Sequence, residues 1–277
     1  MNDDPTLVLG GGGPVGGAWM TGVLAGLSDV GLDLTRTGTV IGTSGGAIFG
    51  ARLASGEPAG ELYARQLAGD DRVELNVTLA QTLRYLWAAR GSRDPERSVR
   101  RLGRAALAAR TGPESDLFGL VTRMLRGVRA WPDRTLRITA VDARVGHLHV
   151  FDASSPLTLP QAVAASCAVP LVLPPVHAAG TRWIDGGSRS TANIHLARGH
   201  RRVLAVAPVP AAVGPHPHAG RQAAQLVAEG SSVTLITPDR ASRRAMGRDL
   251  TAVARCPDAA RAGHSQAASL AQTVLDW

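Results

Sequence analysis

Residues 7–27 read LVLGGGGPVGGAWMTGVLAGL and residues 40–50 read VIGTSGGAIFG, and these two stretches decide the fold. In each of them a short apolar run ends in a cluster of glycines, and the glycines lead into a segment of helical character. A strand, a tight loop and a helix in this order, repeated along a chain, are typical of a parallel sheet with helices on its faces. Such sheets bind ligands at the carboxyl ends of their strands, where we expect both glycine clusters.

The second cluster, residues 42–46, reads GTSGG and matches the G-x-S-x-G pattern of a nucleophile elbow. In such an elbow the serine lies on a sharp turn between a strand and a helix, which exposes its hydroxyl. Gly42 and Gly46 flank the turn, because side chains would be crowded at these positions. The pattern predicts that Ser44 is a nucleophile. A glycine-rich turn with Ser44 near a helix N-cap is the structural alternative.

The first cluster places Gly11, Gly12 and Gly13 ahead of a helix, where unpaired backbone N–H groups favour negative charge. These three glycines are therefore candidates for an oxyanion hole. Together with Gly16 they also satisfy the G-x-G-x-x-G fingerprint of dinucleotide-binding proteins, and Asp33 follows at about the distance of a ribose-binding acid. A nicotinamide-dependent oxidoreductase is thus an alternative, although it leaves the serine elbow unexplained.

The composition is that of a globular protein: 277 residues, 44% hydrophobic and 19% charged, which fits a single large α/β domain. The net charge is +8, and all 30 basic residues are arginine. The lack of lysine excludes a Walker A loop, a Ser–Lys pair and a Schiff base. We expect no nucleic-acid partner, because no recognised motif accompanies the charge. Arginines cluster between positions 84 and 129, which favours attraction to an anionic membrane surface instead.

Cys167 and Cys256 are far apart, so neither a disulfide framework nor a zinc site is indicated, and we expect no metal. Residues 1–5 lack the features of a signal peptide, and prolines interrupt the longest apolar stretch, residues 162–176. We therefore expect a cytoplasmic enzyme, with peripheral contact to a membrane as a further expectation. The sequence leaves the oligomeric state open.

Residues 57–130 differ from the rest and predict a helical, arginine-rich insertion within the single domain. One group of apolar residues at helical spacing comprises Leu79, Leu83, Leu86 and Trp87. A second such group lies within residues 117–128, and arginines crowd residues 93–110 between the two groups. These helices either cover one side of the domain or form a lid whose apolar and arginine faces meet a lipid surface.

After residue 134 the sheet is expected to resume. We predict strands at 136–141, 147–151, 203–207 and 233–236, a helix at 159–167 and a closing helix at 266–277. Residues 181–187 read TRWIDGG, which places Asp185 at the end of a short apolar run, followed by Gly186 and Gly187. Asp-Gly is a common turn signal, so this aspartate on its own could be purely structural.

Taken in order, the motifs GGGGPVG, GTSGG, AASCAVPLVLPP and DGG resemble those of the patatin-like phospholipases. The resemblance is strong over residues 6–56 and 135–195. It implies a three-layer α/β/α sandwich with a mostly parallel central sheet, and an active site similar to that of cytosolic phospholipase A2. By this resemblance Ser44 is the nucleophile and Asp185 is its only side-chain partner. The family motif G-G-G-x-[KR]-G has a basic residue where this sequence has Val15.

The chemistry of the two residues agrees with these roles. A serine hydroxyl needs a base to become a nucleophile, and a carboxylate becomes a stronger base when burial raises its pKa. Trp183 and Ile184 precede Asp185, consistent with an apolar surrounding. We therefore predict a serine lipid acyl hydrolase of the phospholipase A or esterase type, with an acyl-enzyme intermediate and no cofactor. Its substrate would be a lipid or another acyl ester, and the acyl acceptor could be water or another alcohol.

Two other functions stay open at this point. An ordinary α/β-hydrolase would use a Ser-Asp-His triad. The histidines available after the aspartate are His195, His200, His216, His218 and His264. A non-catalytic lipid-binding or protein-binding module on the same scaffold is the other hypothesis. Replacement of single histidines would test the first, and labelling of Ser44 by a fluorophosphonate would test the second.

Overall fold

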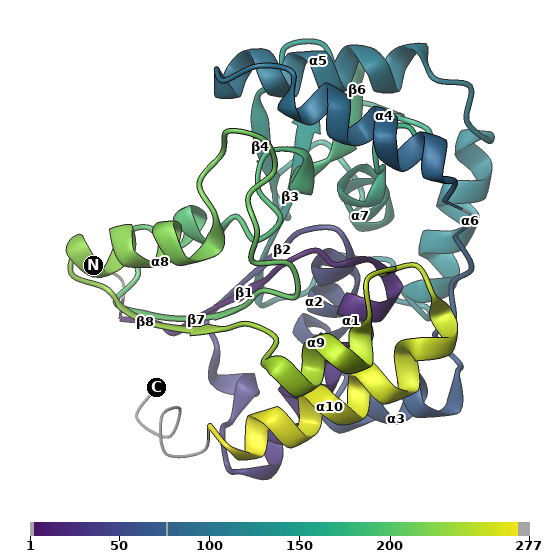
Figure 1. Ribbon diagram of the computed structural model, residues 1–277. Helices are drawn as coiled ribbons and strands as arrows, with labels where there is room; N and C mark the ends of the chain where they lie inside the picture. The colour runs from purple at the N-terminus through teal and green to yellow at the C-terminus, as the bar shows by residue number, and fades with distance from the viewer. Residues whose placement is uncertain (1–2, 76, 271–277) are drawn as a thin grey trace.

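The structure of the protein is a computed structural model, which describes residues 3–75 and 77–270 (Figure 1). Within these residues one eight-stranded sheet has the order β5-β6-β3-β2-β1-β7-β8, with β4 paired to β3. The strands are β1 (Thr6–Leu9), β2 (Thr39–Gly42), β3 (Thr135–Asp142), β4 (Leu148–Phe151), β5 (Val176–Ala178), β6 (Thr181–Asp185), β7 (Arg202–Val206) and β8 (Ser232–Ile236). Four neighbouring pairs, from β3 through β2, β1 and β7 to β8, are parallel, and the pairs made by β4, β5 and β6 are antiparallel. The predicted mostly parallel sheet is confirmed.

Helices cover both faces of this sheet, which confirms the three-layer architecture. They are α1 (Gly13–Asp29), α2 (Gly45–Ala54), α3 (Ala59–Ala68), α4 (Leu79–Arg90), α5 (Pro95–Ala108), α6 (Glu114–Met124), α7 (Leu159–Cys167), α8 (Ala219–Ala228), α9 (Arg240–Met246) and α10 (Cys256–Ala268). Alternate strand residues point to opposite faces. The face with Leu9 and Val40 packs against α1, α2, α6, α7 and α10, whereas the face with Val8 and Ile41 packs against α8. Helix α5 packs on β3 and β6 through Val99.

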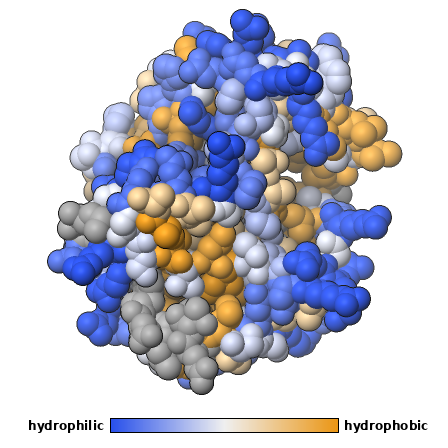
Figure 2. Space-filling model, turned by 60° about the vertical axis from the view of Figure 1, so that its left-hand side comes forward, coloured by the Kyte–Doolittle hydropathy of each residue, from blue (hydrophilic) through white to orange (hydrophobic). Residues whose placement is uncertain are grey.

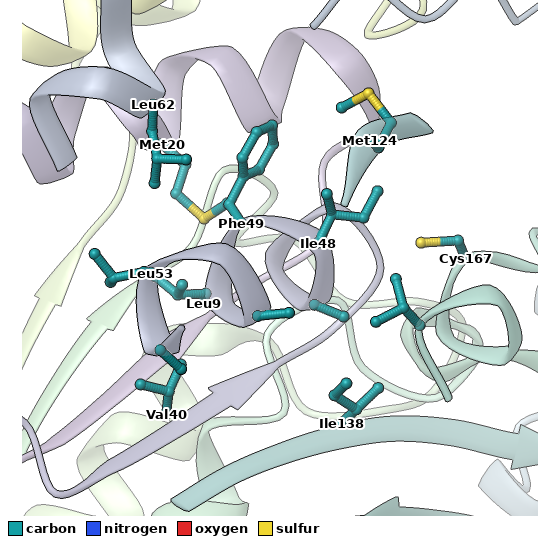
Figure 3. Packing of buried hydrophobic residues seen from close by; sticks show 14 of the residues in the cluster. Leu9, Met20, Val40, Ile48, Phe49, Leu53, Leu62, Met124, Ile138 and Cys167 are labelled. Atoms are coloured by element: carbon teal, nitrogen blue, oxygen red, sulfur yellow. The ribbon is translucent and has the colours of Figure 1, made fainter. Parts of the chain in front are cut away.

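The larger core joins the first strands to the helix that follows Ser44. Figure 3 shows Val40 and Ile138 of the strands on one side of α2, and Phe49 of α2 beside Met20 of α1. Leu9 of β1 belongs to the same cluster. All of these side chains are buried. Helix α2 is therefore held between the sheet and α1, which gives its N-terminus a rigid support.

A buried charge anchors the far end of α2. The side chain of Arg52 is fully buried and pairs with Glu57 at 2.6 Å and with Asp71 at 2.7 Å. A buried ion pair is costly to break, because one charge is then left in the interior without a partner. These contacts tie the end of α2 to the segments on either side of α3.

Gly22 and Gly26 lie four positions apart on one face of helix α1, a spacing that predicts close packing of this helix against the sheet. The structure gives the two glycines a different neighbour. In the structure a Cβ on Gly22 would collide with the backbone carbonyl of Ala260, and a Cβ on Gly26 would lie 2.6 Å from the carbonyl oxygen of His264. Both glycines thus allow close contact with α10, and α1 and α10 pack tightly side by side.

Only the first residues of the predicted closing helix fall within the described part of the chain. We expected it to cover residues 266–277, but the described helix is α10, residues Cys256–Ala268. Residues 271–277 of the prediction lie outside the described residues. Pro257 occupies the first turn of this helix, where its missing N–H costs nothing, and small residues of the helix face α1.

The described residues between 57 and 130 include helices α3, α4, α5 and α6, and these helices have different neighbours. Helix α3 packs on α1 and α10, and α6 packs on α7, so both belong to the body of the domain. Helices α4 and α5 contact each other and lie at the opposite end of the molecule from α3 and α10 (Figure 1). In the apolar group on α6, Leu117 and Val121 are buried, whereas most of the apolar group on α4 is exposed.

The strand register brings the two sequence motifs together. Strand β2 pairs with Thr135 to Ile138 of β3, and β6 pairs with Ala140 to Asp142. Strand β4 pairs with residues 138–141 of β3, which overlap the residues that pair with β2 and those that pair with β6. Because a strand has one neighbour on each edge, β4 lies on the edge of β3 opposite to β2 and β6. Strands β2 and β6 therefore follow one another along a single edge and approach each other from opposite directions. One ends just before Ser44, and the other ends at Asp185.

Candidate active site

Ser44 lies on the sharp turn between β2 and α2 in a backbone conformation that only a constrained turn maintains. Its φ is 55° and its ψ is −123°. A Cβ on Gly42 would lie 2.6 Å from the Cα of Ala47, and one on Gly46 would collide with the carbonyl oxygen of Leu9. Both flanking positions thus require glycine, as the elbow pattern predicts. Ser44 occupies the N-cap position of α2, but its side chain makes no capping hydrogen bond, which leaves the hydroxyl for other uses.

Asp185 lies at the end of β6 and is almost completely buried, with 5% of its surface exposed. Its Oδ1 accepts a hydrogen bond of 2.6 Å from the N–H of Gly187, and the Ser44 side chain is a further hydrogen-bond partner of the carboxyl. Burial raises the pKa of Asp185 to about 6, while these two hydrogen bonds oppose the rise. A carboxylate with this pKa is mostly ionised at neutral pH and is a better proton acceptor than an exposed aspartate.

The end of α7 holds both residues. The N–H of Ser44 donates to Oγ of Ser166 at 2.8 Å, and the N–H of Asp185 donates to the carbonyl oxygen of Ala168 at 2.9 Å. Helix α7 itself begins with a capping box between Thr158 and Gln161. The predicted helix at 159–167 is confirmed, and its C-terminal segment positions the two residues that the sequence singled out.

The glycine loop after β1 lies beside Ser44, but its three glycines differ in their hydrogen bonds. The N–H of Gly11 donates to the carbonyl oxygen of Thr191 at 2.7 Å, so it is not a free donor as we had expected. Among the described residues, the N–H groups of Gly12 and Gly13 have no hydrogen-bond acceptor. Gly11 has a steric role instead, because a Cβ there would lie 3.0 Å from the Cβ of Ser44.

Pro208, which follows β7, keeps this loop in place. A Cβ added to Gly12 would lie 2.7 Å from the Cβ of Pro208, and one added to Gly16 would lie 2.9 Å from it. Val15, at the position where the family motif has a basic residue, is fully buried in the apolar core. Its N–H donates to the carbonyl oxygen of Leu250 at 3.1 Å. The position therefore serves packing in this chain.

A buried polar cluster connects the segments around both motifs. The side-chain amide of Asn193 donates to Oγ1 of Thr43 at 3.0 Å and to the carbonyl oxygen of Gly186 at 3.3 Å. The hydroxyls of Thr43 and Thr139 lie 2.9 Å apart. A Cβ on Gly186 would collide with the Thr139 hydroxyl, which explains the glycine after Asp185. Asn193 thereby joins the residue before Ser44 to the residue after Asp185.

Ser44, Asp185 and the glycine loop line one cavity of about 290 Å³. Its other walls are mainly apolar and include Val169 and Val172 after α7, and helix α4 covers it with Gln81, Tyr85 and Leu86. Burial and the nearby Asp185 charge both raise the pKa of Tyr85 above its ordinary value. Pockets that are mostly apolar with a few convergent polar groups are typical of small-molecule sites.

The predicted alternatives do not fit this geometry. None of the five histidines considered for a triad lines the cavity that contains Ser44 and Asp185. His264 instead lies 2.7 Å from Asp29, and His195 contacts Gln222. Asp33 caps the 3₁₀ helix η1 (Leu34–Arg36), which precedes β2, so it does not lie at the end of that strand as a ribose-binding acid would.

The described residues contain neither a metal-binding cluster nor a membrane-spanning helix. In residues 3–75 and 77–270, no group of three or more histidine, cysteine or acidic side chains is arranged to hold a metal ion. Nor does that part of the chain contain a helix with the length and apolar character needed to span a bilayer. Cys167 is buried near Asp185, and burial, followed by this charge, raises the pKa of its thiol.

Sequence reasoning missed three residues that surround the pair. Ser166 lies in the AASCAVP motif, but we assigned it no role. Tyr85 belongs to a segment that was interpreted only by its apolar spacing. Asn193 has φ 48°, a left-handed conformation that asparagine adopts more readily than most residues, yet nothing in its neighbourhood indicates a hydrogen-bond network.

Comparisons with known proteins identify the family and support the fold. A model of the family described as "Patatin-like phospholipase" matches residues 7–198. No curated protein matches the chain in a sequence search.

Among solved structures, VipD from Legionella pneumophila is 12% identical with a TM-score of 0.50, over 99% of this chain and 67% of that one. The type III effector ExoU is 14% identical with a TM-score of 0.42, over 98% of this chain and 53% of that one. A complex of ExoU with SpcU, from the type III secretion system of Pseudomonas aeruginosa, is 17% identical with a TM-score of 0.39, over 96% and 53%. The likeness to VipD supports the fold alone, and the chain spans about half the length of the ExoU chains.

Proposed function

Because the chain belongs to the patatin-like phospholipase family, we propose that it is a serine lipid acyl hydrolase acting through Ser44 and Asp185. One observation supports this function above the others. The hydroxyl of a serine on a strained elbow and a buried carboxyl of raised pKa share one apolar cavity, and none of the described residues that line this cavity is a histidine. A base of this kind can activate a serine without an imidazole.

In the proposed acylation step, the Asp185 carboxylate takes the proton of the Ser44 hydroxyl. The Oγ of Ser44 attacks the ester carbonyl carbon, and negative charge develops on the carbonyl oxygen. The free N–H groups of Gly12 and Gly13 are the donors available to this oxyanion, and one such donor is typically worth about 2.7–4 kcal/mol of barrier. Protonated Asp185 then gives its proton to the leaving alcohol, and the acyl group stays on Ser44.

In the deacylation step the roles repeat with water. Asp185, again ionised, takes a proton from a water molecule, whose oxygen attacks the acyl carbon. The second oxyanion uses the same two backbone donors. When it collapses, the acid leaves and Ser44 recovers its proton from Asp185. The serine and the aspartate end in their starting states, so these steps require no cofactor.

The walls of the cavity support an apolar acyl chain as the part of the substrate that enters. Leu75, Val172 and Leu250 line the cavity together with the two catalytic candidates. Burial of each methylene of an acyl chain against such walls contributes about 0.8 kcal/mol. The substrate class that fits is an ester of a fatty acid, and a phospholipid is the member of this class that the family indicates.

The test is a labelling experiment combined with ester hydrolysis. A fluorophosphonate probe should label the intact protein but not Ser44→Ala, and Ser44→Ala and Asp185→Asn should each lower turnover of a nitrophenyl ester about a thousandfold or more. Ser231→Ala is a matched control, because Ser231 is a buried serine whose hydroxyl bonds a backbone carbonyl elsewhere in the fold. Labelling of Ser44→Ala would contradict the proposal. A loss of about 10⁴-fold in any single histidine variant would establish a triad instead.

A further inference from the structure

Helix α4 has one face toward the cavity and another face toward solvent. Gln81, Tyr85 and Leu86 point toward the cavity, and the side chain of Gln81 donates to the carbonyl oxygen of Leu171 at 3.0 Å, on the loop after α7. This hydrogen bond connects the helix to a part of the cavity wall that comes from another segment. The inner face of α4 is therefore a cover over the proposed catalytic pair.

The outer face of the same helix carries an apolar stripe. Leu79, Leu83 and Trp87 are 73%, 56% and 72% exposed, and they are the three most exposed large apolar side chains among the described residues. Their spacing of four residues places them in one row along the helix. Scattered exposed apolar residues are common, but a row on one helix indicates a surface that meets an apolar partner.

Positive charge surrounds the stripe. Residues 78–110 contain eight arginines and two acidic residues, so this segment carries most of the net charge of the chain. The guanidinium of Arg101, on α5, lies 4.6 Å from the centre of the Trp87 ring, which places a cation and an indole side by side. Figure 2 shows hydrophilic side chains gathered at the top of the molecule, the end where Figure 1 places α5.

We propose that the outer face of α4 docks on an anionic lipid surface, with Leu79, Leu83 and Trp87 inserted among the lipids and the arginines of α4 and α5 at the phosphates. Amphipathic helices with leucine and tryptophan on one side and arginine beside them bind the membrane interface in this manner. The excess of positive charge favours anionic lipid over a neutral apolar partner. The proposal rests on the proposed function, since docking there would bring the cavity beneath α4 next to its lipid substrate.

The test measures binding without turnover. Ser44→Ala protein is sedimented with vesicles of phosphatidylcholine alone, and with vesicles of phosphatidylcholine mixed with phosphatidylglycerol. We expect about tenfold tighter binding to the mixed vesicles, and a loss of binding as salt screens the charges. Adding Leu79→Ser, Leu83→Ser and Trp87→Ser together should weaken this binding about tenfold. Val227→Ser is the matched control, because Val227 is 54% exposed on α8.

The outcomes separate this proposal from the proposed function. Equal binding to neutral and anionic vesicles would overturn the docking proposal. Unchanged binding after the three serine substitutions would overturn it as well. So would a change from dimer to monomer on the same substitution, which would make the face a contact between two copies of the chain. The proposed function is tested by ester turnover and the docking proposal by vesicle binding. A wild-type protein that binds anionic vesicles but does not hydrolyse esters would contradict only the proposed function. Hydrolysis of a dissolved short-chain ester is then measured for a variant that has the three serine substitutions and an intact Ser44. A rate equal to that of the wild-type protein supports a role of the three residues in surface binding alone, and a loss of this rate contradicts it.

Discussion

The backbone N–H of Ser44 donates a hydrogen bond of 2.8 Å to the side-chain oxygen of Ser166, 122 positions further along the chain. Two residues after Ser166, the carbonyl oxygen of Ala168 accepts the N–H of Asp185. One short segment at the end of α7 thus sets the separation of the proposed nucleophile and its base. Because Ser44 has a positive φ, this hydrogen bond also helps to maintain a conformation that an unsupported turn would leave.

Ser166→Ala tests this support. The substitution leaves the partly buried N–H of Ser44 without its acceptor, and a lost hydrogen bond of this kind costs about 1 kcal/mol or more. We expect kcat for a dissolved ester to fall about tenfold with little change in KM, because the elbow loses its geometry and the cavity keeps its walls. Steady-state kinetics measure the split. Ser231→Ala, the buried serine used above as a control, should leave kcat unchanged, and an equal loss there would mean a general effect on the fold.

The pKa of Asp185 predicts the pH dependence of the rate. With burial raising this pKa to about 6, the carboxyl loses its proton as pH rises through that value, and only the ionised form can accept the Ser44 proton. We expect kcat/KM to rise tenfold per pH unit below about 6 and to level off above it. His216→Gln should leave the profile unchanged, since burial and then Arg189 lower the pKa of His216 to about 4. A profile that is flat across this range would contradict the role of Asp185.

The raised pKa of the Asp185 carboxyl also predicts how the free energy of unfolding depends on pH. The unfolded carboxyl ionises near 3.8 and the folded one near 6, so between these values only the folded state holds the proton. The contribution of Asp185 to stability is therefore fully present below the unfolded pKa and is lost as pH rises through the folded pKa. Asp185→Asn should raise the free energy of unfolding at pH 8 by up to about 3 kcal/mol, and the gain should vanish below pH ~4. Urea denaturation at both pH values measures it, and a variant less stable at the higher pH would refute the prediction.

Gly11→Ala separates the steric role of the loop from its role as a donor. A methyl group there would lie 3.0 Å from the Cβ of Ser44 and 3.7 Å from its Oγ. We expect a loss of about a hundredfold in kcat/KM with a folded protein, because the methyl group occupies space beside the nucleophile. Gly60→Ala is the matched control, since a Cβ at Gly60 meets nothing within 4 Å. Near-UV circular dichroism checks the fold, and full activity of Gly11→Ala would show that the loop lies elsewhere during the reaction.

Asn193 connects the two motifs through its amide, and a double-mutant cycle measures the connection. Asn193→Gly removes the amide and keeps the conformational freedom needed at φ 48°, while Thr139→Val removes a hydroxyl in the same cluster. Each should lower the free energy of unfolding by about 1–3 kcal/mol, and the pair should cost less than the sum. Additive losses in urea denaturation would mean that the two side chains act separately.

Much of the fold and the candidate residues could be predicted from local patterns. The elbow places glycines two positions before and two positions after Ser44, and the structure shows a physical obstacle at each of these positions. The strands near the glycine clusters and the helix at 159–167 follow from short apolar runs, prolines and capping residues, which act over a few positions. Such signals survive in a single sequence because their causes are neighbours along the chain.

Errors arose where the partner of a pattern lies elsewhere in the fold. Gly22 and Gly26 indicate that something approaches α1 closely, but only the packing shows that α10 does so. The spacing of Leu79, Leu83 and Trp87 shows that one face of α4 is apolar, yet spacing cannot show that this face is exposed. Periodicity describes the surface of a helix and contains no information on what covers that surface.

By itself, the sequence determined that this chain has a serine on a glycine-flanked turn, an aspartate before two glycines, and a parallel α/β core. Tertiary structure alone decided that β2 and β6 share one edge of β3, so that Ser44 meets Asp185. It also decided that the N–H of Gly11 donates to Thr191, whereas the N–H groups of Gly12 and Gly13 have no acceptor among the described residues. The reason is physical: a turn is determined by the residues that form it, whereas a hydrogen-bond acceptor and a buried environment are provided by segments over a hundred positions away.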